Sequence, residues 1–481
     1  MTADPFSNYI AGTWAAGSGA VPNINPSDLN DTIGDYAQAS AAQTADAIEA
    51  AAAAFPKWRA TSPLVRFEVL DRIGSEILAR VDELGDMLAR EEGKTLPEAK
   101  AEAHRAGHLF KYFAAEAYRA TGDAYQSLRE GVSLKVLREP IGVVGVITPW
   151  NFPLAIPAWK IAPALAYGNT VVFKPAELVP GSAWMLSDII ARAGLPEGVF
   201  NLVMGKGREV GEAIVLHPKV SGVTFTGSTP VGRNMGAALF ARGAKMQLEM
   251  GGKNPLVVLD DADLDLAVHC AIQGSFFSTG QRCTASSRLI VEDGIHDQFV
   301  SAMTAAMKKL RIGDARAPDT DIGPVASADQ LRIDLDYIAR GQAEGAELIS
   351  GDQITLNTPG HYLEPALFVG AEPQMDISRH EIFGPIAAVL RVPDYEAALA
   401  SANDCEFGLS AGIISRDAAK IDHFSQNAEA GMVQVNLPTA GMDFHAPFTG
   451  RKGSSYGAPE KGSYCREFFT VAKVVHEGRG Q

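Results

Sequence analysis

The stretch from residue 140 to 177 reads PIGVVGVITPWNFPLAIPAWKIAPALAYGNTVVFKPAE. It holds two short runs rich in β-branched residues, at 141–147 and 169–173, with a helical pattern between them. The same alternation continues along the chain, with two further runs at 199–204 and 222–225. Apolar strands that alternate with helices of ten or more residues indicate an α/β fold, in which helices cover both faces of a parallel sheet.

Ligands of such sheets bind at the carboxyl ends of the strands. The segments that follow the four runs are TPWN (148–151), KPAE (174–177), GKG (205–207) and TGS (226–228). Glycine, serine and threonine at the start of a helix suit a phosphate group. Each glycine-rich segment taken alone fits an ordinary strand-to-helix turn equally well.

The elements around this stretch also have recognisable patterns. Helices are expected at 44–59, with Thr44 as the cap, at 63–90 and at 96–118, and a hairpin or extended arm at 125–139. A second α/β stretch spans 251–438, with strand runs at 255–259, 288–291 and 387–392. The tail at 467–477 alternates like an edge strand.

Composition limits the class of protein. The 481 residues are 46% hydrophobic, which is enough for a large core, and the formal net charge of −15 argues against nucleic-acid binding. No run approaches the roughly 18 apolar residues of a membrane span, and no secretory signal is visible, so the expected location is the cytoplasm. The four cysteines lack zinc-ligand spacing, so we expect no metal site and three buried thiols: Cys270, Cys405 and Cys465.

Three residues are candidates for chemistry. Cys283 lies among small polar residues, and Arg282 beside it would favour the thiolate, which is the reactive form. Glu249 precedes a Gly-Gly pair, and burial would raise its pKa towards the range of a general base. Asn151 could donate its amide to a developing oxyanion. The alternatives are an inert buried cysteine, a surface glutamate and a turn-forming asparagine.

Six motifs in one order resemble those of the aldehyde dehydrogenase superfamily. They are PWNFPL (149–154), FKPAE (173–177), FTGSTPVGR (225–233), LEMGGKNP (248–255), GQRCTASSR (280–288) and EIFGPI (381–386). The resemblance implies a Rossmann-like NAD-binding domain over 1–119 and 140–250 and an α/β catalytic domain over 251–445. It also implies a small β oligomerisation arm over 120–139 and 461–481, in a homodimer or homotetramer.

The resemblance also implies a mechanism for oxidising an aldehyde. Cys283 would attack the aldehyde carbon to form a thiohemiacetal, while the Asn151 amide and the Cys283 N–H hold the oxyanion. Hydride transfer to the nicotinamide would leave a thioester, which Glu249 would help water to hydrolyse. Lys174 is the fourth residue that the resemblance places in the catalytic set.

The cofactor implied is NAD. The expected binding residues are Thr148, Pro149, Trp150, Lys174, Glu177, Gly207, Gly227, Ser228, Glu381 and Phe383. A carboxylate at Glu177 would accept a hydrogen bond from the ribose 2′-OH and repel a 2′-phosphate, so NAD is expected over NADP. An ordinary strand-end charge pair is the other interpretation of Lys174 and Glu177.

The substrate tunnel is expected to be lined by Phe152, Trp159, Arg282, Thr284 and Phe448. A guanidinium at Arg282 would pair with a substrate carboxylate. The blocks at 435–441 and 450–455 resemble the α-ketoglutarate semialdehyde (2,5-dioxovalerate) dehydrogenase subgroup. The alternatives are succinate semialdehyde, an aromatic or aliphatic aldehyde, and a non-catalytic binding or structural role; the matching Glu249 disfavours acyl transfer to coenzyme A.

Overall fold

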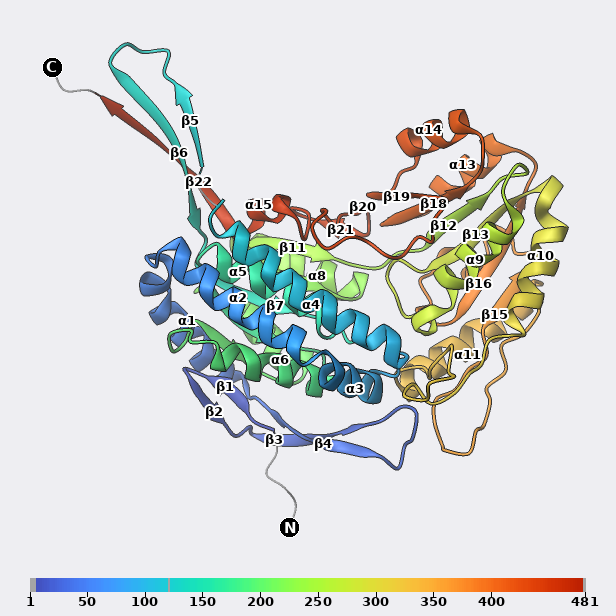
Figure 1. The fold of residues 1–481 in the computed structure, drawn as a ribbon, viewed down its shortest axis with the longest axis horizontal. Helices are drawn as coiled ribbons and strands as arrows, with labels where there is room; N and C mark the ends of the chain where they lie inside the picture. Colours follow the sequence, from blue (N-terminus) through green and yellow to red (C-terminus); the bar gives the residue numbers. More distant parts are fainter. Residues whose placement is uncertain (1–5, 120–121, 479–481) are drawn as a thin grey trace.

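The computed structural model describes residues 6–119 and 122–478, so small parts of the expected NAD-binding domain and arm, residues 1–5, 120–121 and 479–481, lie outside the described residues. Two separate sheets form the two main bodies of the molecule (Figure 1). A third, three-stranded sheet projects from the first body as an arm. The expected α/β class is confirmed.

The first sheet has eight strands in the order β2-β1-β9-β8-β7-β10-β11-β21. Its five central strands are parallel and have the order 3-2-1-4-5 of a doubly wound dinucleotide-binding sheet. They are β7 (Val143–Ile147), β8 (Thr170–Lys174), β9 (Phe200–Leu202), β10 (Val220–Thr226) and β11 (Lys245–Glu249). The edges are antiparallel: β1 (Asn8–Ile10), β2 (Thr13–Ala15) and β21 (Ser455–Tyr456).

Alternate residues of the central strands enter two different cores, one on each face of the sheet. Val144 and Val146 pack towards one group of helices, and Val143 and Val172 pack towards the other. Both faces are buried, which is why these strands appear in the sequence as continuous apolar runs. The first group is α2 (Pro63–Ala79), α3 (Val81–Glu92), α4 (Leu96–Glu116), α5 (Ala155–Ala166) and α6 (Pro180–Arg192). The second is α1 (Ala41–Arg59), α7 (Glu212–Leu216) and α8 (Thr229–Ala241).

Two predictions for these helices are wrong. Helix α1 begins at Ala41 rather than at Thr44, because the Ser40 side chain accepts from Gln43 N–H and the Gln43 side chain bonds back to Ser40 N–H. Thr44 is buried inside the helix instead, and its hydroxyl donates to the Ser40 carbonyl. The single helix expected at 63–90 is broken at Arg80, which has non-helical backbone angles between α2 and α3.

The second sheet has seven strands in the order β14-β15-β16-β13-β12-β18-β19, all parallel except β14. They are β12 (Asn254–Val258), β13 (Ser286–Glu292), β14 (Glu347–Leu348), β15 (Ala366–Val369), β16 (Ile386–Val392), β18 (Ser410–Ile414) and β19 (Met432–Val435). Helices cover both faces of this sheet too: α9 (Leu264–Ser275) and α10 (Asp293–Met307) on one, and α11 (Ala328–Ala343), α12 (Asp376–Arg379), α13 (Tyr395–Asn403) and α14 (Ala418–Asn427) on the other.

The arm consists of β5 (Gly122–Gln126), β6 (Val132–Pro140) and β22 (Thr470–Gly478), in the order β22-β6-β5. The expected hairpin is therefore present. The tail strand begins at Thr470 rather than at residue 467, because residues Arg466–Phe469 form a helical turn, α15. Two small antiparallel pairs complete the fold: β3 (Gly19–Ile24) with β4 (Thr32–Gln38), and β17 (Phe407–Gly408) with β20 (Arg451–Lys452).

Across the described ranges, no helix is both long and apolar enough to cross a membrane. The same residues contain no cluster of three or more His, Cys, Asp or Glu side chains that would hold a metal ion. Cys270 and Cys465 are buried as expected, whereas Cys405 is partly exposed. That part of the cysteine prediction is wrong, because Cys405 follows the end of α13 in a connecting loop.

Candidate active site

The loop that carries Cys283 has an unusual backbone. Ser278, Thr279 and Gly280 are three consecutive residues with φ between 51° and 65°, the left-handed region that side-chain-bearing residues rarely adopt. A Cβ on Gly280 would lie 2.1 Å from the Gly384 carbonyl oxygen. Only glycine fits at this position, and the strain is the kind that surrounding structure must hold in place.

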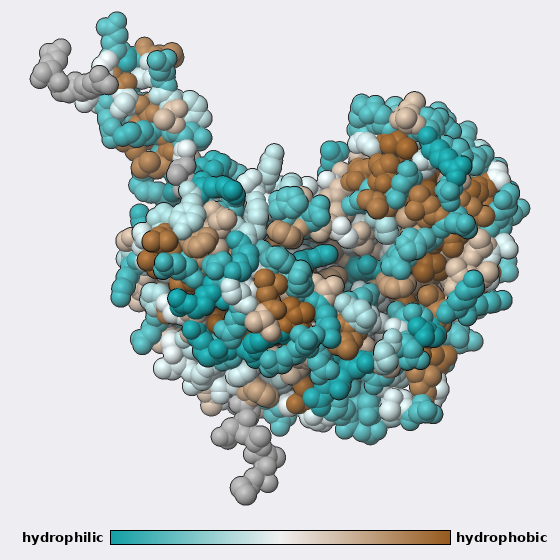
Figure 2. Space-filling model, in the orientation of Figure 1, coloured by the Kyte–Doolittle hydropathy of each residue, from teal (hydrophilic) through white to brown (hydrophobic). Residues whose placement is uncertain are grey.

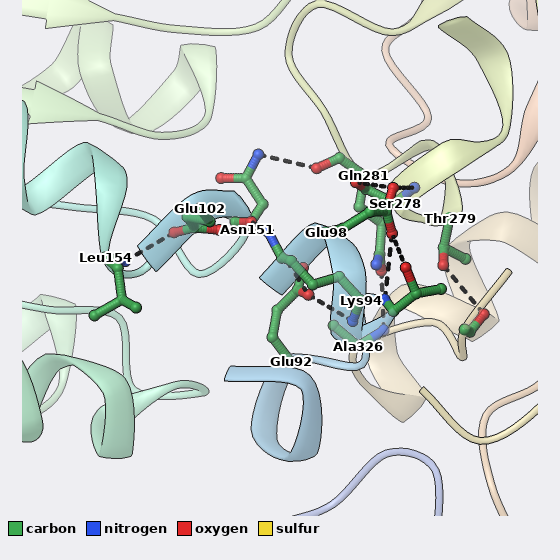
Figure 3. Close-up of polar contacts among 12 residues, drawn as sticks. Glu92, Lys94, Glu98, Glu102, Asn151, Leu154, Ser278, Thr279, Gln281 and Ala326 are labelled. Atoms are coloured by element: carbon green, nitrogen blue, oxygen red, sulfur yellow. Dashed lines mark hydrogen bonds and ion pairs between the residues drawn. The ribbon is translucent and has the colours of Figure 1, made fainter. Parts of the chain in front are cut away.

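Contacts from several elements hold this loop (Figure 3). Glu98 of α4 accepts from the Ser278 N–H at 2.8 Å and from its hydroxyl at 2.9 Å. The Gln281 side chain accepts from Ala326 N–H at 2.9 Å, and Thr279 donates to the Gly323 carbonyl at 3.1 Å. These bonds hold the loop that leads to Cys283. The position of the Cys283 thiol therefore depends on residues that are far away in the sequence.

The amide of Asn151 is directed at the same loop. Its Nδ2 donates to the Gln281 carbonyl at 2.9 Å, and the residue is buried. An amide nitrogen has two hydrogens, so one remains to donate to an oxyanion. The Asn151 backbone is fixed by the buried Lys94, whose Nζ donates to the Asn151 carbonyl at 2.6 Å and to Glu102 at 2.7 Å. Figure 3 shows these groups meeting between α4 and the loop after β7.

Glu249 is the last residue of β11 and is 3% exposed. Burial, with the nearby Glu460 carboxylate, raises its pKa well above the ordinary value, although the Ser455 hydroxyl donates to it at 2.5 Å. The burial and the raised pKa expected from the sequence are confirmed. A carboxylate in this condition takes up a proton far more readily than a surface glutamate.

A buried ion pair near Glu249 was missed from the sequence. Lys160 of α5 donates to Thr224 Oγ1 at 2.9 Å and pairs with Glu460, and both charged side chains are almost fully buried. Burial lowers the pKa of Lys160, despite the carboxylates of Glu460 and Glu249. The available signal was a single lysine inside the apolar helix AIPAWKIAPALA, since a charge on such a helix needs a buried partner.

The thiolate expected at Cys283 is not favoured in this structure. Burial, together with the carboxylates of Glu381 and Glu249, raises the pKa of Cys283 to about 12. Arg282 and the Cys283 thiolate attract each other, but this attraction does not outweigh burial and the carboxylates, and the Arg282 Nη2 is directed at the carbonyls of Gln273 and Phe277, at 2.6 and 2.7 Å. The expectation that Arg282 makes the thiolate the favoured form is therefore wrong, and the thiol must lose its proton before it reacts as a nucleophile.

Two cavities meet at Cys283, and the surface is visibly hollowed between the two bodies (Figure 2). The first lies at the carboxyl ends of β7 and β10, where the strand order reverses. It brings together six of the residues expected to bind the cofactor: Pro149, Trp150, Gly227, Ser228, Glu381 and Phe383.

This first cavity fits a dinucleotide. Thr148 Oγ1 and Thr226 Oγ1 are buried at the strand ends with no hydrogen-bond partner in the structure. Helix α8 begins at Thr229, and Ser228, its N-cap, lines the cavity and makes no side-chain capping bond, so the first N–H groups of the helix are available to a phosphate. Unpaired hydroxyls beside a free helix N-terminus are the donor set that a pyrophosphate and a ribose require.

The remaining cofactor candidates lie apart from this cavity. Glu177 is exposed and accepts from Gly207 N–H at 2.8 Å. Lys174 is buried, its Nζ donates to the Pro175 carbonyl at 2.9 Å, and burial lowers its pKa to about 8. Lys174, Glu177 and Gly207 form a second cluster of polar contacts, at the carboxyl ends of β8 and β9. The structure thus places Lys174 away from Cys283, and its role in catalysis stays a prediction.

The second cavity reaches Cys283 from the opposite side. It is lined by all five residues expected in the substrate tunnel: Phe152, Trp159, Arg282, Thr284 and Phe448. Trp159 and Phe448 stack with their ring centroids 5.7 Å apart. Two basic residues that the sequence did not single out, Arg105 and Lys461, also line it. No motif contains them, because they come from α4 and from a loop near the C-terminus.

A thiol between a cavity that fits a dinucleotide and an aromatic-walled tunnel is the arrangement of a covalent oxidoreductase. The chain belongs to the aldehyde dehydrogenase family, whose model matches residues 14–475. It is an enzyme that oxidises aldehyde groups, and the family resemblance read from the sequence is confirmed.

Its relatives include enzymes named for one substrate. The chain is 44% identical over 476 residues to the alpha-ketoglutaric semialdehyde dehydrogenase of Bacillus subtilis, covering 98% of this chain and 97% of the relative. It is 39% identical over 473 residues to the 2,5-dioxopentanoate dehydrogenase of Saccharolobus solfataricus, covering 98% of each. Betaine aldehyde dehydrogenase of Staphylococcus aureus, solved in complex with NAD+, superposes with a TM-score of 0.96 at 31% identity, covering 99% of this chain and 95% of that one.

The left-handed loop gives a first prediction. Gly280→Ala should abolish nearly all activity, because the added Cβ would overlap the Gly384 backbone carbonyl and so displace the loop that carries Cys283. Gly243→Ala is the matched control: Gly243 is also left-handed, with φ of 68°, but an added Cβ meets nothing within 4 Å. That control should lose only about 1–2 kcal/mol of folding free energy and keep its turnover. Aldehyde oxidation and urea unfolding, measured on both variants, test this; equal effects on activity would contradict it.

Proposed function

We propose that this enzyme oxidises α-ketoglutarate semialdehyde (2,5-dioxopentanoate), a carboxylate-bearing aldehyde, to the acid with NAD as hydride acceptor. The observation that carries the proposal is that one thiol, Cys283, lines both a dinucleotide-shaped cavity and a tunnel with basic residues. The names of the two relatives described above support the choice of substrate. A carboxylate on the substrate would meet favourable charges in such a tunnel.

The chain's own residues account for the chemistry around the thiol. The Cys283 thiol would first give up its proton to solvent water. Its sulfur would then attack the aldehyde carbon, and Asn151 Nδ2 and the Cys283 N–H would donate to the oxyanion that forms. Bound NAD supplies the hydride acceptor. Glu249 would then take a proton from the water that attacks the Cys283 thioester, and the Lys160–Glu460 pair lies beside it to carry that proton onward.

The cofactor would lie across the first sheet. Trp150, Ser228 and Glu381 line the cavity beside Cys283, and Lys174 and Glu177 lie further along the strand ends. The exposed Glu177 carboxylate would favour a ribose 2′-OH over a 2′-phosphate, which supports NAD over NADP. The solved complex of the Staphylococcus aureus relative with NAD+ supports the same choice.

The substrate proposal is tested by measuring NADH formation with 2,5-dioxopentanoate, succinate semialdehyde, benzaldehyde and propanal. We expect the carboxylated semialdehydes, with 2,5-dioxopentanoate first, to exceed the uncharged aldehydes in kcat/KM by about tenfold or more, which is about 1.4 kcal/mol. NAD should be preferred to NADP, and Cys283→Ala should be inactive. Preference for benzaldehyde or propanal would overturn the substrate, and preference for NADP would overturn the cofactor.

The role of Glu249 gives a third prediction. Glu249→Gln should keep the first turnover but slow steady-state turnover by roughly 10²–10⁴-fold, because a base for hydrolysis is missing. Since the pKa of Glu249 is raised, wild-type turnover should fall as the pH is lowered through a value well above 4.5. This fall in turnover at low pH should be absent in the Glu249→Gln variant. The exposed Glu347→Gln serves as control, and loss of the first turnover as well would show that Glu249 acts earlier.

We propose further that residues 1–119 and 140–250 form the cofactor-binding domain, 251–445 the catalytic domain, and the arm a subunit interface in a dimer or tetramer. The arm projects with apolar side chains on both faces: Tyr125 and Val474 are 58% and 55% exposed on one, and Leu137 and Val471 43% and 44% on the other. Figure 2 shows apolar groups on the side of the arm that faces the viewer. The second face also carries the ion pairs Lys473–Glu139 and Lys135–Glu477. A ribbon with exposed apolar side chains on both faces suits burial against a second copy.

Val474→Lys should weaken this assembly by about tenfold or more, since it places an unpaired charge in a buried interface. Light scattering coupled to size-exclusion chromatography, run over a range of protein concentrations, measures the mass. Lys308→Gln, an exposed residue at the end of α10 and outside the arm, is the control and should leave the mass unchanged. A monomeric wild type, or a Val474→Lys variant that keeps the wild-type mass, would contradict the proposed interface.

A further inference from the structure

The tunnel on the substrate side of Cys283 is lined by five charged side chains, and both carboxylates are already engaged. The five are Glu98, Glu102, Arg105, Arg282 and Lys461. Glu102 is paired with Lys94 and also accepts from two backbone N–H groups. Glu98 accepts four hydrogen bonds, two from Thr95 and two from Ser278.

One of the three cations is engaged as well. Arg282 donates from Nη2 to two backbone carbonyls. Although burial lowers the pKa of Arg282, the Glu98 carboxylate is the group that most favours its charge. Arg282 and Glu98 therefore balance each other, and the positive charge left in the tunnel belongs to Arg105 and Lys461.

In the part of the chain that the structure describes, neither Arg105 nor Lys461 forms an ion pair with a carboxylate, although the Glu460 and Asp443 carboxylates favour the charge of Lys461 from further away. Among the described residues, Arg105 on α4 makes no hydrogen bond or ion pair, and its side chain is half-buried. Lys461 is 1% exposed; its Nζ donates to the Asp443 carbonyl at 3.2 Å and lies 5.3 Å and 5.0 Å from the ring centroids of Trp159 and Phe448. Aromatic faces stabilise an ammonium but do not neutralise it.

Holding the Lys461 ammonium in the tunnel costs folding free energy. Lys461 has a left-handed backbone, with φ of 57°, which is strained for a lysine. Glu460 before it exchanges two backbone hydrogen bonds with Phe448, and this pairing keeps the lysine against the tunnel wall. Burial and the neighbouring Arg105 lower the pKa of Lys461 to about 8. An anion between the two side chains would supply the charge that both lack.

We propose that Arg105 and Lys461 together bind the carboxylate at the far end of the aldehyde substrate, and so select carboxylated over uncharged aldehydes. The inference rests on the proposed function, since it concerns the carboxylate of that substrate. Lys461 lies on the buried wall of the tunnel and Arg105 nearer to solvent, so the pair would hold the carboxylate while the aldehyde reaches Cys283. Arg282, by contrast, is a positioning residue for the nucleophile loop.

The test compares two aldehydes that differ only in the terminal group, 5-oxopentanoate and pentanal. Arg105→Gln and Lys461→Met should each lower kcat/KM for 5-oxopentanoate and 2,5-dioxopentanoate by about tenfold or more, mainly by raising KM, while pentanal changes by less than about twofold. Arg105→Lys, which keeps the charge, should retain most of the preference. A merely structural role for either residue would lower activity on both aldehydes equally.

Lys100→Gln on the same helix is the matched control. It removes one positive charge from a residue outside the tunnel and should leave both aldehydes unaffected. Calorimetric binding of 2-oxoglutarate, the product, to the Cys283→Ala protein should weaken by a similar factor when Arg105→Gln is added. Because Arg105 is half-exposed, its variant is expected to fold even if Lys461→Met does not.

The outcomes separate the two proposals. If the wild type prefers 5-oxopentanoate and the Arg105 variant keeps that preference, the subsite is wrong and the proposed substrate class stands. If the wild type prefers pentanal, both are wrong. Loss of the preference in the variants, with pentanal oxidation and the Lys100→Gln control unchanged, is the result that supports the subsite.

Discussion

The reaction centre depends on one buried ammonium, that of Lys94. A charge this deep needs partners, and the Glu102 and Glu92 carboxylates offset the penalty of burial so that the pKa of Lys94 is raised rather than lowered. The same Nζ holds the Asn151 carbonyl, and it lies 4.0 Å from the centre of the Phe152 ring. One charge thus links Asn151 and a wall of the tunnel to Glu102 of helix α4.

Helix α4 also holds the loop that carries Cys283. One turn after Lys94, Glu98 binds Ser278 of the left-handed loop and so sets where Cys283 lies. The first sheet supplies Asn151 and Glu249, and the second body supplies the thiol. Helix α4 contacts both bodies, which explains how side chains from two separate hydrophobic cores keep fixed positions relative to one another. The strained loop can persist because these contacts over-determine it.

Charge is divided between the two sides of the thiol. Glu249, Glu381 and Glu460 lie towards the cofactor cavity and the water-activating side, and together with burial they keep Cys283 protonated in this structure. Basic side chains lie on the tunnel side. An anionic substrate would therefore be attracted to the side where its aldehyde meets the sulfur. The protein as a whole carries a net charge of −15, so this local positive region is a feature of the tunnel alone.

The sequence by itself determined the α/β class, the family and the strand runs, and it singled out Cys283, Glu249 and Asn151 as candidates, because apolar periodicity and short motifs are local properties. One local signal was misread, since Ser40 and not Thr44 caps α1 through its bonds with Gln43. Elsewhere distant residues decide: burial beside carboxylates overrode Arg282 in setting the pKa of Cys283. Lys94, Lys160, Glu460, Arg105 and Lys461 belong to no motif that the sequence analysis recognised. Only the tertiary structure brings them to the site, since a buried charge has meaning only through partners that folding places beside it.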